Sequence, residues 1–371
     1  MTSNRLFSRG FTLDFRRDIA PFVIYSLIFF VVLPLGPLTG SLWVTSKQYL
    51  TMHILDQMCF GAPQVFLILF SYTEAAHQFG FLFRKNETDF FHSLPQSRKV
   101  IFRTRYISGI LEVLIPFLAF ELITVPIVLT VLKTNPTFIP KLLLGLAISI
   151  MMFVLSYTVN VLAFELTGKG LTGIFGMLIL QFFFYVSGVV IEGLSGVWYG
   201  YFNPLIERFL PMDSVAESLM RINVPAVFAS IGAWFRKMFY DPDSYYDVNR
   251  PARMEIVVPV CLLLIAGLYF LSRYLHQKRA LERAGEAMAF PATERPIQII
   301  LSVFGGLIGA IFFGTITLHT LWYFFGAVFG TCVIHVIVET IYTTDIRKAF
   351  SHPLRLGIAL VIVLIIAILF K

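Results

Sequence analysis

The chain has 371 residues, of which 57% are hydrophobic and 14% are charged, and its formal net charge is +7. The charged fraction is about half of the ~25% that is typical of soluble domains, which excludes an ordinary soluble enzyme or binding module. The composition and the long apolar runs predict an all-α integral membrane protein, a polytopic helical bundle.

Nine apolar runs are long enough to cross the ~30 Å hydrocarbon core of a bilayer as helices. The first run ends at Pro37 without a small-residue cleavage site, so it is expected to be a retained helix and not a signal peptide. Five of the predicted helices lie in 19–191 and four in 255–371. The nine predicted spans are 19–38, 54–72, 106–132, 141–166, 171–191, 255–272, 297–317, 321–341 and 356–370.

The distribution of Lys and Arg predicts the orientation, because positively charged loops stay in the cytoplasm. With a cytoplasmic N-terminus, the inner segments hold 19 of the 29 basic residues. The aromatic-rich segment 192–254 then becomes an extracellular or interfacial loop. The inner segments are 1–18, 73–105, 167–170, 273–296 and 342–355.

The N-terminal segment 1–18 carries Phe7, Phe11 and Phe15 on one helical stripe and arginines on the opposite one. This pattern predicts an amphipathic helix on the inner lipid surface, and an ordinary charged tail is the alternative. The net positive charge needs no nucleic acid to explain it, because anionic lipid in the bilayer is the expected partner. The three cysteines stand alone in or beside apolar runs and predict neither a disulfide framework nor a metal site.

The most informative polar stretch is DFFHSLPQSRKVIFRTRY at 89–106, inside the predicted cytoplasmic loop 73–105. It predicts a short helix that ends at a Leu-Pro break, followed by a second helix that opens on basic residues. A short helix with aromatic and acidic side chains below the membrane suits docking into a partner, and a plain amphipathic connector is the alternative. The candidate docking residues are Asp89, Phe90, Phe91, Leu94, Pro95 and Arg98.

Ionisable residues inside predicted membrane helices are expensive to bury and tend to be functional. Glu112 and Glu121 lie on the third predicted helix, and Glu121 is the deeper of the two. Glu121 is predicted either to accept hydrogen bonds in packing or to contact a cationic substrate. His335 and Glu339 share one face of the eighth helix, where a hydrogen bond to a neighbouring helix or loop is favoured over a metal or proton-relay role.

An enzymatic reading depends on Gly193-Leu194-Ser195-Gly196, which matches the GxSG around the serine of intramembrane proteases of the rhomboid type, with His319 or His335 as its base. The structural alternative, a glycine-rich exit from the fifth helix, is favoured. No enzyme activity and no catalytic residue is therefore predicted for this chain.

The polar stretch resembles the opening of a helix in permease subunits of bacterial ABC exporters of the bacitracin-export and antimicrobial-peptide-resistance type. The similar residues are Asp89, Ser93-Leu94-Pro95, Ser97-Arg98 and Val100-Ile101-Phe102-Arg103. A C-terminal part resembles the inner loops of a Firmicute subgroup through Arg283-Ala284-Gly285-Glu286-Ala287-Met288-Ala289-Phe290, His335, Glu339-Thr340-Ile341-Tyr342 and Asp345-Ile346-Arg347. Members of that subgroup often carry a large extracytoplasmic domain after the last helix, whereas this sequence ends at Lys371.

The resemblance implies a transport subunit in the bacterial cytoplasmic membrane that moves an amphipathic or hydrophobic substrate such as a peptide, an antibiotic or a lipid. The sequence has no Walker motif, so ATP and Mg²⁺ are expected on separate cytoplasmic ABC ATPase subunits, with no cofactor on this chain. Two permease copies, identical or different, would pair over two ATPases that receive the short helix at 89–98. A sensor or resistance subunit that does not transport is the alternative.

Overall fold

The computed structural model of the protein describes residues 19–41, 54, 57–93, 96–131, 138–197, 254–317, 319–348 and 350–370. Within these residues the regular structure is helical, apart from one isolated antiparallel bridge between Thr167 and Met288. The long helices are α2 (Ile19–Ser41), α4 (Ala62–Phe79), α6 (Arg98–Val131), α7 (Phe138–Leu166), α8 (Gly170–Val197), α12 (Met254–Lys278), α13 (Pro291–Thr317), α14 (Thr320–Thr343) and α15 (Pro353–Leu369). Short elements are α5 (Lys85–Ser93), η1 (Gly80–Phe83), η2 (Leu281–Arg283) and η3 (Ile346–Lys348).

Seven of the described helices are long and apolar enough to cross a membrane, which confirms the prediction of a helical, multi-pass membrane protein. They are α2, α6, α7, α8, α12, α13 and α14. The other two predicted spans differ. Helix α4 was expected at 54–72 but covers Ala62–Phe79 and carries buried polar side chains, and α15 is short for a span, with 17 residues. A total of nine spans and a cytoplasmic N-terminus stay predictions.

Segment 1–18, with its predicted amphipathic helix, lies outside the described residues. The same holds for 198–253, which is most of the predicted aromatic loop. The edges of that loop are helical: α8 continues to Val197, six residues beyond the predicted end of the fifth span, and α12 begins at Met254.

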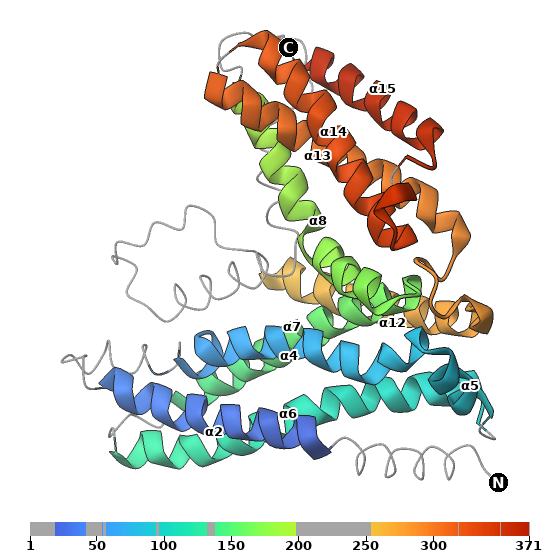
Figure 1. Cartoon of the computed structure of the whole chain (residues 1–371). Coiled ribbons are helices and arrows are strands. Elements are labelled where there is room, and N and C mark those ends of the chain that lie inside the picture. The colour runs from blue at the N-terminus through green and yellow to red at the C-terminus, as the bar shows by residue number, and fades with distance from the viewer. Residues whose placement is uncertain are drawn as a thin grey trace. The chain divides into compact units, whose positions relative to one another are not determined.

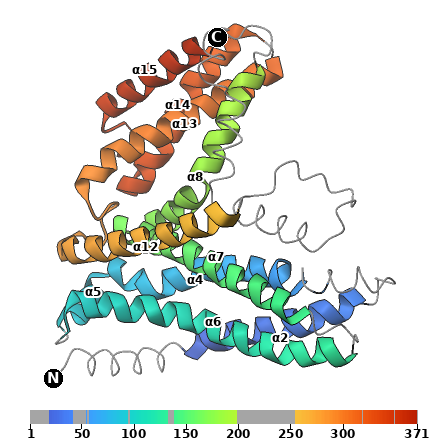
Figure 2. The same ribbon diagram turned by 180° about the vertical axis from the view of Figure 1, so that it is seen from behind.

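The described chain divides into two compact units, and the first contains α2, α4, α5, α6, α7 and α12. In Figures 1 and 2, α2, α4, α6 and α7 run alongside one another. Phe29 of α2 joins two neighbouring helices, with ring centroids 5.3 Å from Phe70 of α4 and 5.4 Å from Phe117 of α6. These aromatic contacts fix α2 along both helices.

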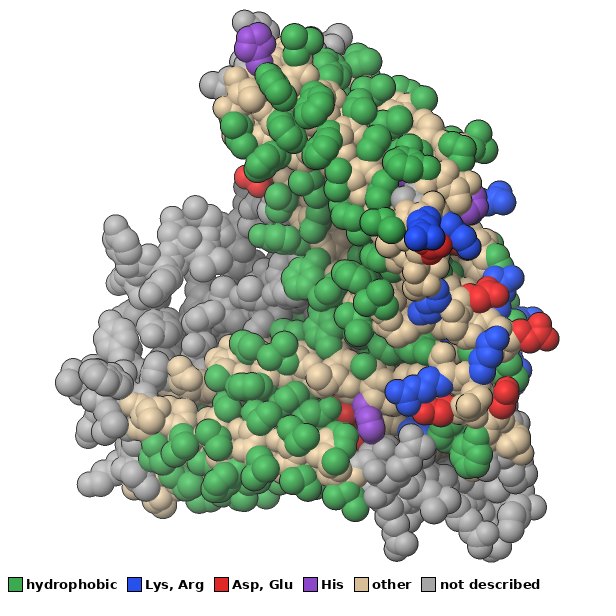
Figure 3. Space-filling model, viewed as in Figure 1, with side chains coloured by type: hydrophobic (Ala, Val, Ile, Leu, Met, Phe, Trp, Pro, Cys, Tyr) green, Lys and Arg blue, Asp and Glu red, His purple; other side chains and the backbone are tan. Residues whose placement is uncertain are grey.

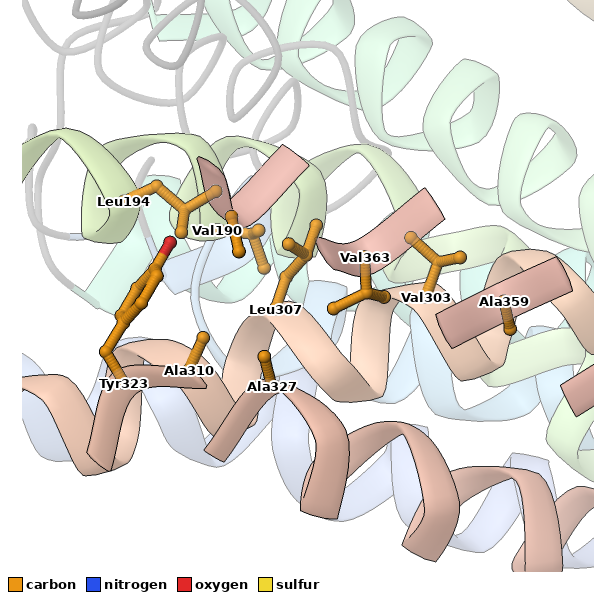
Figure 4. Packing of buried hydrophobic residues seen from close by; sticks show 10 residues of the cluster. Val190, Leu194, Val303, Leu307, Ala310, Tyr323, Ala327, Ala359 and Val363 are labelled. Atoms are coloured by element: carbon orange, nitrogen blue, oxygen red, sulfur yellow. The ribbon is translucent and has the colours of Figure 1, made fainter. Parts of the chain in front are cut away.

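The second unit contains α8, α13, α14 and α15, which share the hydrophobic cluster drawn in Figure 4. Helices α13 and α14 approach closely because glycines replace side chains where they meet. A Cβ atom on Gly309 would lie 2.3 Å from the carbonyl oxygen of Gly326, and one on Gly330 would lie 2.3 Å from that of Gly305. These residues form two GxxxG pairs, the spacing that lets membrane helices pack backbone to backbone.

Two loops that the charge distribution places on one side of the membrane pair with each other in the second unit. The amide of Gly168 donates to the carbonyl of Ala287 (3.1 Å), and the amide of Gly285 donates to the carbonyl of Gly168 (2.8 Å). Lys169 donates from Nζ to the carbonyl of Tyr342 (3.2 Å), which belongs to a third predicted inner segment. Figure 3 shows that hydrophobic side chains cover most of the visible surface of the long helices in each unit.

Candidate functional site

The candidate site is the short helix α5, which follows η1 and precedes α6 in the first unit. The hydroxyl of Thr88 donates to the carbonyls of Phe81 (2.8 Å) and Arg84 (3.0 Å), which ties α5 to the turn before it. Glu87 in the first turn of α5 pairs with Arg84 at 2.7 Å on the surface. Local hydrogen bonds therefore form α5, and packing of its apolar side chains determines which face stays exposed.

The two adjacent phenylalanines of α5 point in different directions. Phe91 is 7% exposed and packs against Phe81 of η1, with the rings tilted and their centroids 4.8 Å apart. Phe90 is 59% exposed, and Asp89 beside it is also exposed. Phe91 is thus an anchor of α5 on its own bundle, whereas Phe90 and Asp89 are on its exposed face. The docking role predicted for these three residues stays a prediction.

Arg105 of α6 supports α5 from inside the bundle. Its guanidinium lies over the ring of Phe91, 4.7 Å from the centroid, and 5.7 Å from the ring of Phe81. It also donates from Nη1 to Oε1 of Gln78 on α4 at 3.1 Å. This buried guanidinium therefore joins the aromatic rings under α5 to a polar side chain of α4.

Arg98, another predicted docking residue, contacts the backbone of its own chain. Its Nη1 donates to the carbonyls of Gln277 (3.2 Å) and Arg279 (2.9 Å) after α12. Arg98 is therefore a brace between the start of α6 and the end of α12, and its predicted role toward a partner stays a prediction. The predicted docking residues Leu94 and Pro95 lie outside the described residues.

Arg279 is a functional candidate that the sequence analysis missed. It is 4% exposed and donates to the carbonyls of Leu82 (3.3 Å), Phe164 (2.8 Å) and Glu165 (3.1 Å), so it fastens the ends of α12 and α7 to η1, which leads into α5. Burial lowers the pKa of Arg279, and the carboxylate of Glu165 opposes that shift. In the sequence it looks like any other basic residue at the predicted inner end of a span.

The two carboxyls of α6 lie in different surroundings. Glu112 is fully buried and accepts a hydrogen bond from Nε2 of Gln78 at 3.1 Å. Glu121 is 1% exposed, and among the described residues neither of its oxygens has a hydrogen-bond partner. Glu112 therefore belongs to a polar network near α5, whereas Glu121 is the isolated carboxyl that the sequence analysis assigned to packing or to a cationic substrate.

The pair on α14 contacts neighbouring polar groups in the second unit. Glu339 accepts hydrogen bonds from Gln298 of α13 and from Ser351 before α15, and it pairs with His352 at 2.7 Å. His335 lies 3.4 Å from the hydroxyl of Ser302 on α13. In the described residues, no group of three or more His, Cys, Asp or Glu side chains is arranged to hold a metal ion. The arrangement joins α13, α14 and the start of α15.

The protein was compared with family models, with curated proteins and with solved structures. None of the three comparisons gave a match. What can be said about function therefore comes from the site itself. The site is a short amphipathic helix, held in place by Phe91 and Arg105, that leaves Phe90 and Asp89 exposed.

Proposed function

We propose that this chain is the membrane-spanning permease subunit of a bacterial ABC exporter. It would move an amphipathic or hydrophobic substrate across the cytoplasmic membrane, with energy from separate ATPase subunits that bind α5. A second permease copy would complete the transporter. The observation that carries the proposal is the contrast between the anchored Phe91 and the exposed Phe90 on one short helix.

The construction of α5 supports a role in transmitting force. A plain connector needs no aromatic anchor, no guanidinium beneath it and no braces, yet here Phe91, Arg105, Arg98 and Arg279 fix the helix and both segments that flank it. A rigidly seated helix passes a displacement on to the spans that hold it. An exposed Phe in such a position has the character of an interface anchor, because aromatic residues dominate binding energy at protein interfaces.

The proposal is tested by co-purification of the tagged chain with ABC ATPase subunits of the same bacterium. Phe90→Asp places a charge in what would be an apolar socket, and we expect a loss of affinity of ~30-fold or more, from ~2 kcal/mol at ~1.4 kcal/mol per decade. Phe350→Asp is the matched control, because Phe350 is 63% exposed and lies outside α5. ATPase capture that is unchanged by Phe90→Asp, or reduced equally by both variants, would refute docking on α5.

A further inference from the structure

The turn that joins α14 to α15 in the second unit exposes apolar and basic side chains together (Figure 1). Its described part covers 344–348 and 350–352 and contains η3. Two of its residues, and one in the first turn of α15, are among the most exposed large hydrophobic residues that the structure describes. Ile346 is 71% exposed, Phe350 63% and Leu354 77%. We call these three residues the apolar triplet.

Two basic residues follow Ile346 directly. The side chains of Arg347 and Lys348 are exposed, and among the described residues neither side chain forms a hydrogen bond or an ion pair. Their backbone holds the turn together: the amide of Arg347 donates to Oδ1 of Asp345 at 3.0 Å, and the amide of Lys348 donates to the carbonyl of Asp345 at 3.1 Å. The turn therefore presents two positive charges that are available to an anion.

The acidic side chains that flank the turn are engaged inside the unit, so they do not neutralise these two charges. Glu339 of α14 accepts a hydrogen bond from Ser351 and pairs with His352 at 2.7 Å, and Glu294 of α13 pairs with Arg355 at 3.0 Å. No side chain among the described residues caps the N-terminus of α15, whose helix dipole adds positive potential there. The surroundings of the turn therefore favour an anionic partner.

Hydrogen bonds fix the turn at the end of a membrane helix. Thr344 has a left-handed backbone (φ 55°), and its amide donates to the carbonyl of Thr340 at 2.7 Å, which ends α14. The amide of Ser351 donates to the carbonyl of Lys348 at 3.0 Å. Because α14 is long and apolar enough to cross a membrane, the residues that follow its end lie at a membrane surface.

We propose that this turn is a binding surface for anionic phospholipid. Arg347 and Lys348 bind lipid phosphate, and the apolar triplet enters the layer between the headgroups and the acyl chains. Basic residues combined with exposed Phe, Leu or Ile are typical of segments that lie in a membrane interface, where apolar burial and attraction to anionic lipid act together. The proposal goes beyond the proposed function and does not depend on it, because it requires only a bilayer that contains α14.

A protein partner is the other occupant that exposed apolar and basic residues could fit. The structure favours lipid, because the exposed apolar surface continues from the turn along one face of α15. Beyond Leu354, exposed apolar side chains recur every three or four residues as far as the end of the helix. They are Ile358, Val361, Ile365 and Leu369. A helix face of this kind contacts acyl chains, so the turn before it lies at the level of the headgroups.

The first test measures lipid binding to the purified chain by native mass spectrometry, with phosphatidylglycerol and phosphatidylcholine as probes. The double variant Arg347→Gln/Lys348→Gln should weaken phosphatidylglycerol binding by up to ~25-fold, because each basic residue near an anionic surface contributes ~1 kcal/mol, or about fivefold. Phosphatidylcholine binding should stay unchanged. The control Lys278→Gln/Arg295→Gln removes the same number of basic residues from two other exposed positions and should keep phosphatidylglycerol binding close to that of the wild type.

All four of these basic residues are exposed, so both double variants should unfold in detergent at the temperature of the wild type. That result separates a loss of lipid binding from misfolding. Equal losses of phosphatidylglycerol binding in the two double variants would show attraction to net charge alone. Unchanged binding in Arg347→Gln/Lys348→Gln would remove the site. Either result would overturn the proposal.

The second test identifies what contacts the turn in the native membrane. A photoreactive p-benzoylphenylalanine replaces Phe350, whole cells are illuminated, and the purified chain is analysed by mass spectrometry. We expect adducts with phospholipid. Adducts with another protein chain in place of lipid, or no adduct at all, would overturn the proposal. This readout is independent of α5, so a failure of ATPase capture there and a failure of lipid binding here are distinguished.

Discussion

Replacing each of the two neighbouring phenylalanines of α5 by Ala should distinguish the residue that holds α5 on its own bundle from the residue that contacts a partner. Phe91 is 7% exposed and contacts the ring of Phe81 and the guanidinium of Arg105. Truncation of a buried Phe to Ala costs ~3–5 kcal/mol in a protein core, and the cation–π contact adds ~0.5–2 kcal/mol. Because α5 is at the edge of the bundle, we expect Phe91→Ala to lower the free energy of opening of α5 by ~3 kcal/mol, the lower end of that range.

The cost should appear locally, as easier opening of α5, so amide hydrogen exchange is the appropriate assay. A change of ~3 kcal/mol corresponds to roughly 100-fold faster exchange of the α5 amides at ~1.4 kcal/mol per decade. Phe90→Ala at the 59% exposed neighbour should change exchange by less than threefold, because surface substitutions stay within about 0.5 kcal/mol. It should instead weaken ATPase binding by ~2 kcal/mol.

Equal exchange rates in the two variants, or faster exchange in Phe90→Ala than in Phe91→Ala, would refute the seating described for α5. Phe91→Leu provides a graded control, because it keeps much of the buried apolar volume but removes the ring under Arg105. We expect it to fall between the wild type and Phe91→Ala.

Two further predictions concern the packing of each unit. In a thermal-unfolding assay, Gly309→Ala should destabilise the second unit by ~1–3 kcal/mol, because its Cβ would lie 2.3 Å from a backbone carbonyl oxygen of α14. Gly357→Ala is the control: its Cβ meets nothing within 4 Å, so this substitution in a helix should be neutral or stabilising. A lower melting temperature for Gly357→Ala than for Gly309→Ala would contradict the close packing of α13 and α14. Arg279→Ala should lower the free energy of unfolding by at least ~3 kcal/mol, because it removes the donor to three buried carbonyls. The control Arg283→Ala removes only a surface ion pair with Glu286 and should lower it by ~0–1 kcal/mol. Equal melting temperatures for these two variants would count against Arg279 as a brace.

Polar residues at the C-terminal end of α4 have partners in the bundle. Glu74 and Gln78 lower the hydropathy of this helix, and α4 is absent from the seven helices that are apolar enough to span a membrane by themselves. In the bundle these two side chains hydrogen-bond each other, and Tyr25 of α2 and Arg105 of α6 donate to Glu74 and Gln78 respectively. The polar face of α4 is therefore covered by protein, and its cost in lipid is avoided.

The sequence by itself determined the helical, membrane-spanning class of the protein and the order of its helices. Long apolar runs separated by charged segments form membrane-spanning helices in a bilayer. The reason is that each backbone group in lipid must be hydrogen-bonded within its own helix or within a closed sheet. The position of α5 also followed from local signals, with a polar first turn and the Leu94-Pro95 break after it. The extent of α4 did not, because its partners lie on other helices.

Tertiary structure alone decided which of the neighbouring residues face the bundle. Adjacent positions on a helix differ by about 100°, so Phe90 and Phe91 look alike in sequence until the contact with Phe81 and Arg105 makes one an anchor and leaves the other exposed. The same reason explains Arg98 and Arg279: a basic residue at the predicted inner end of a span fits the charge rule whether it contacts water or a buried carbonyl. The choice is made by chain segments far away in sequence, since the carbonyls that bind these guanidiniums belong to other helices.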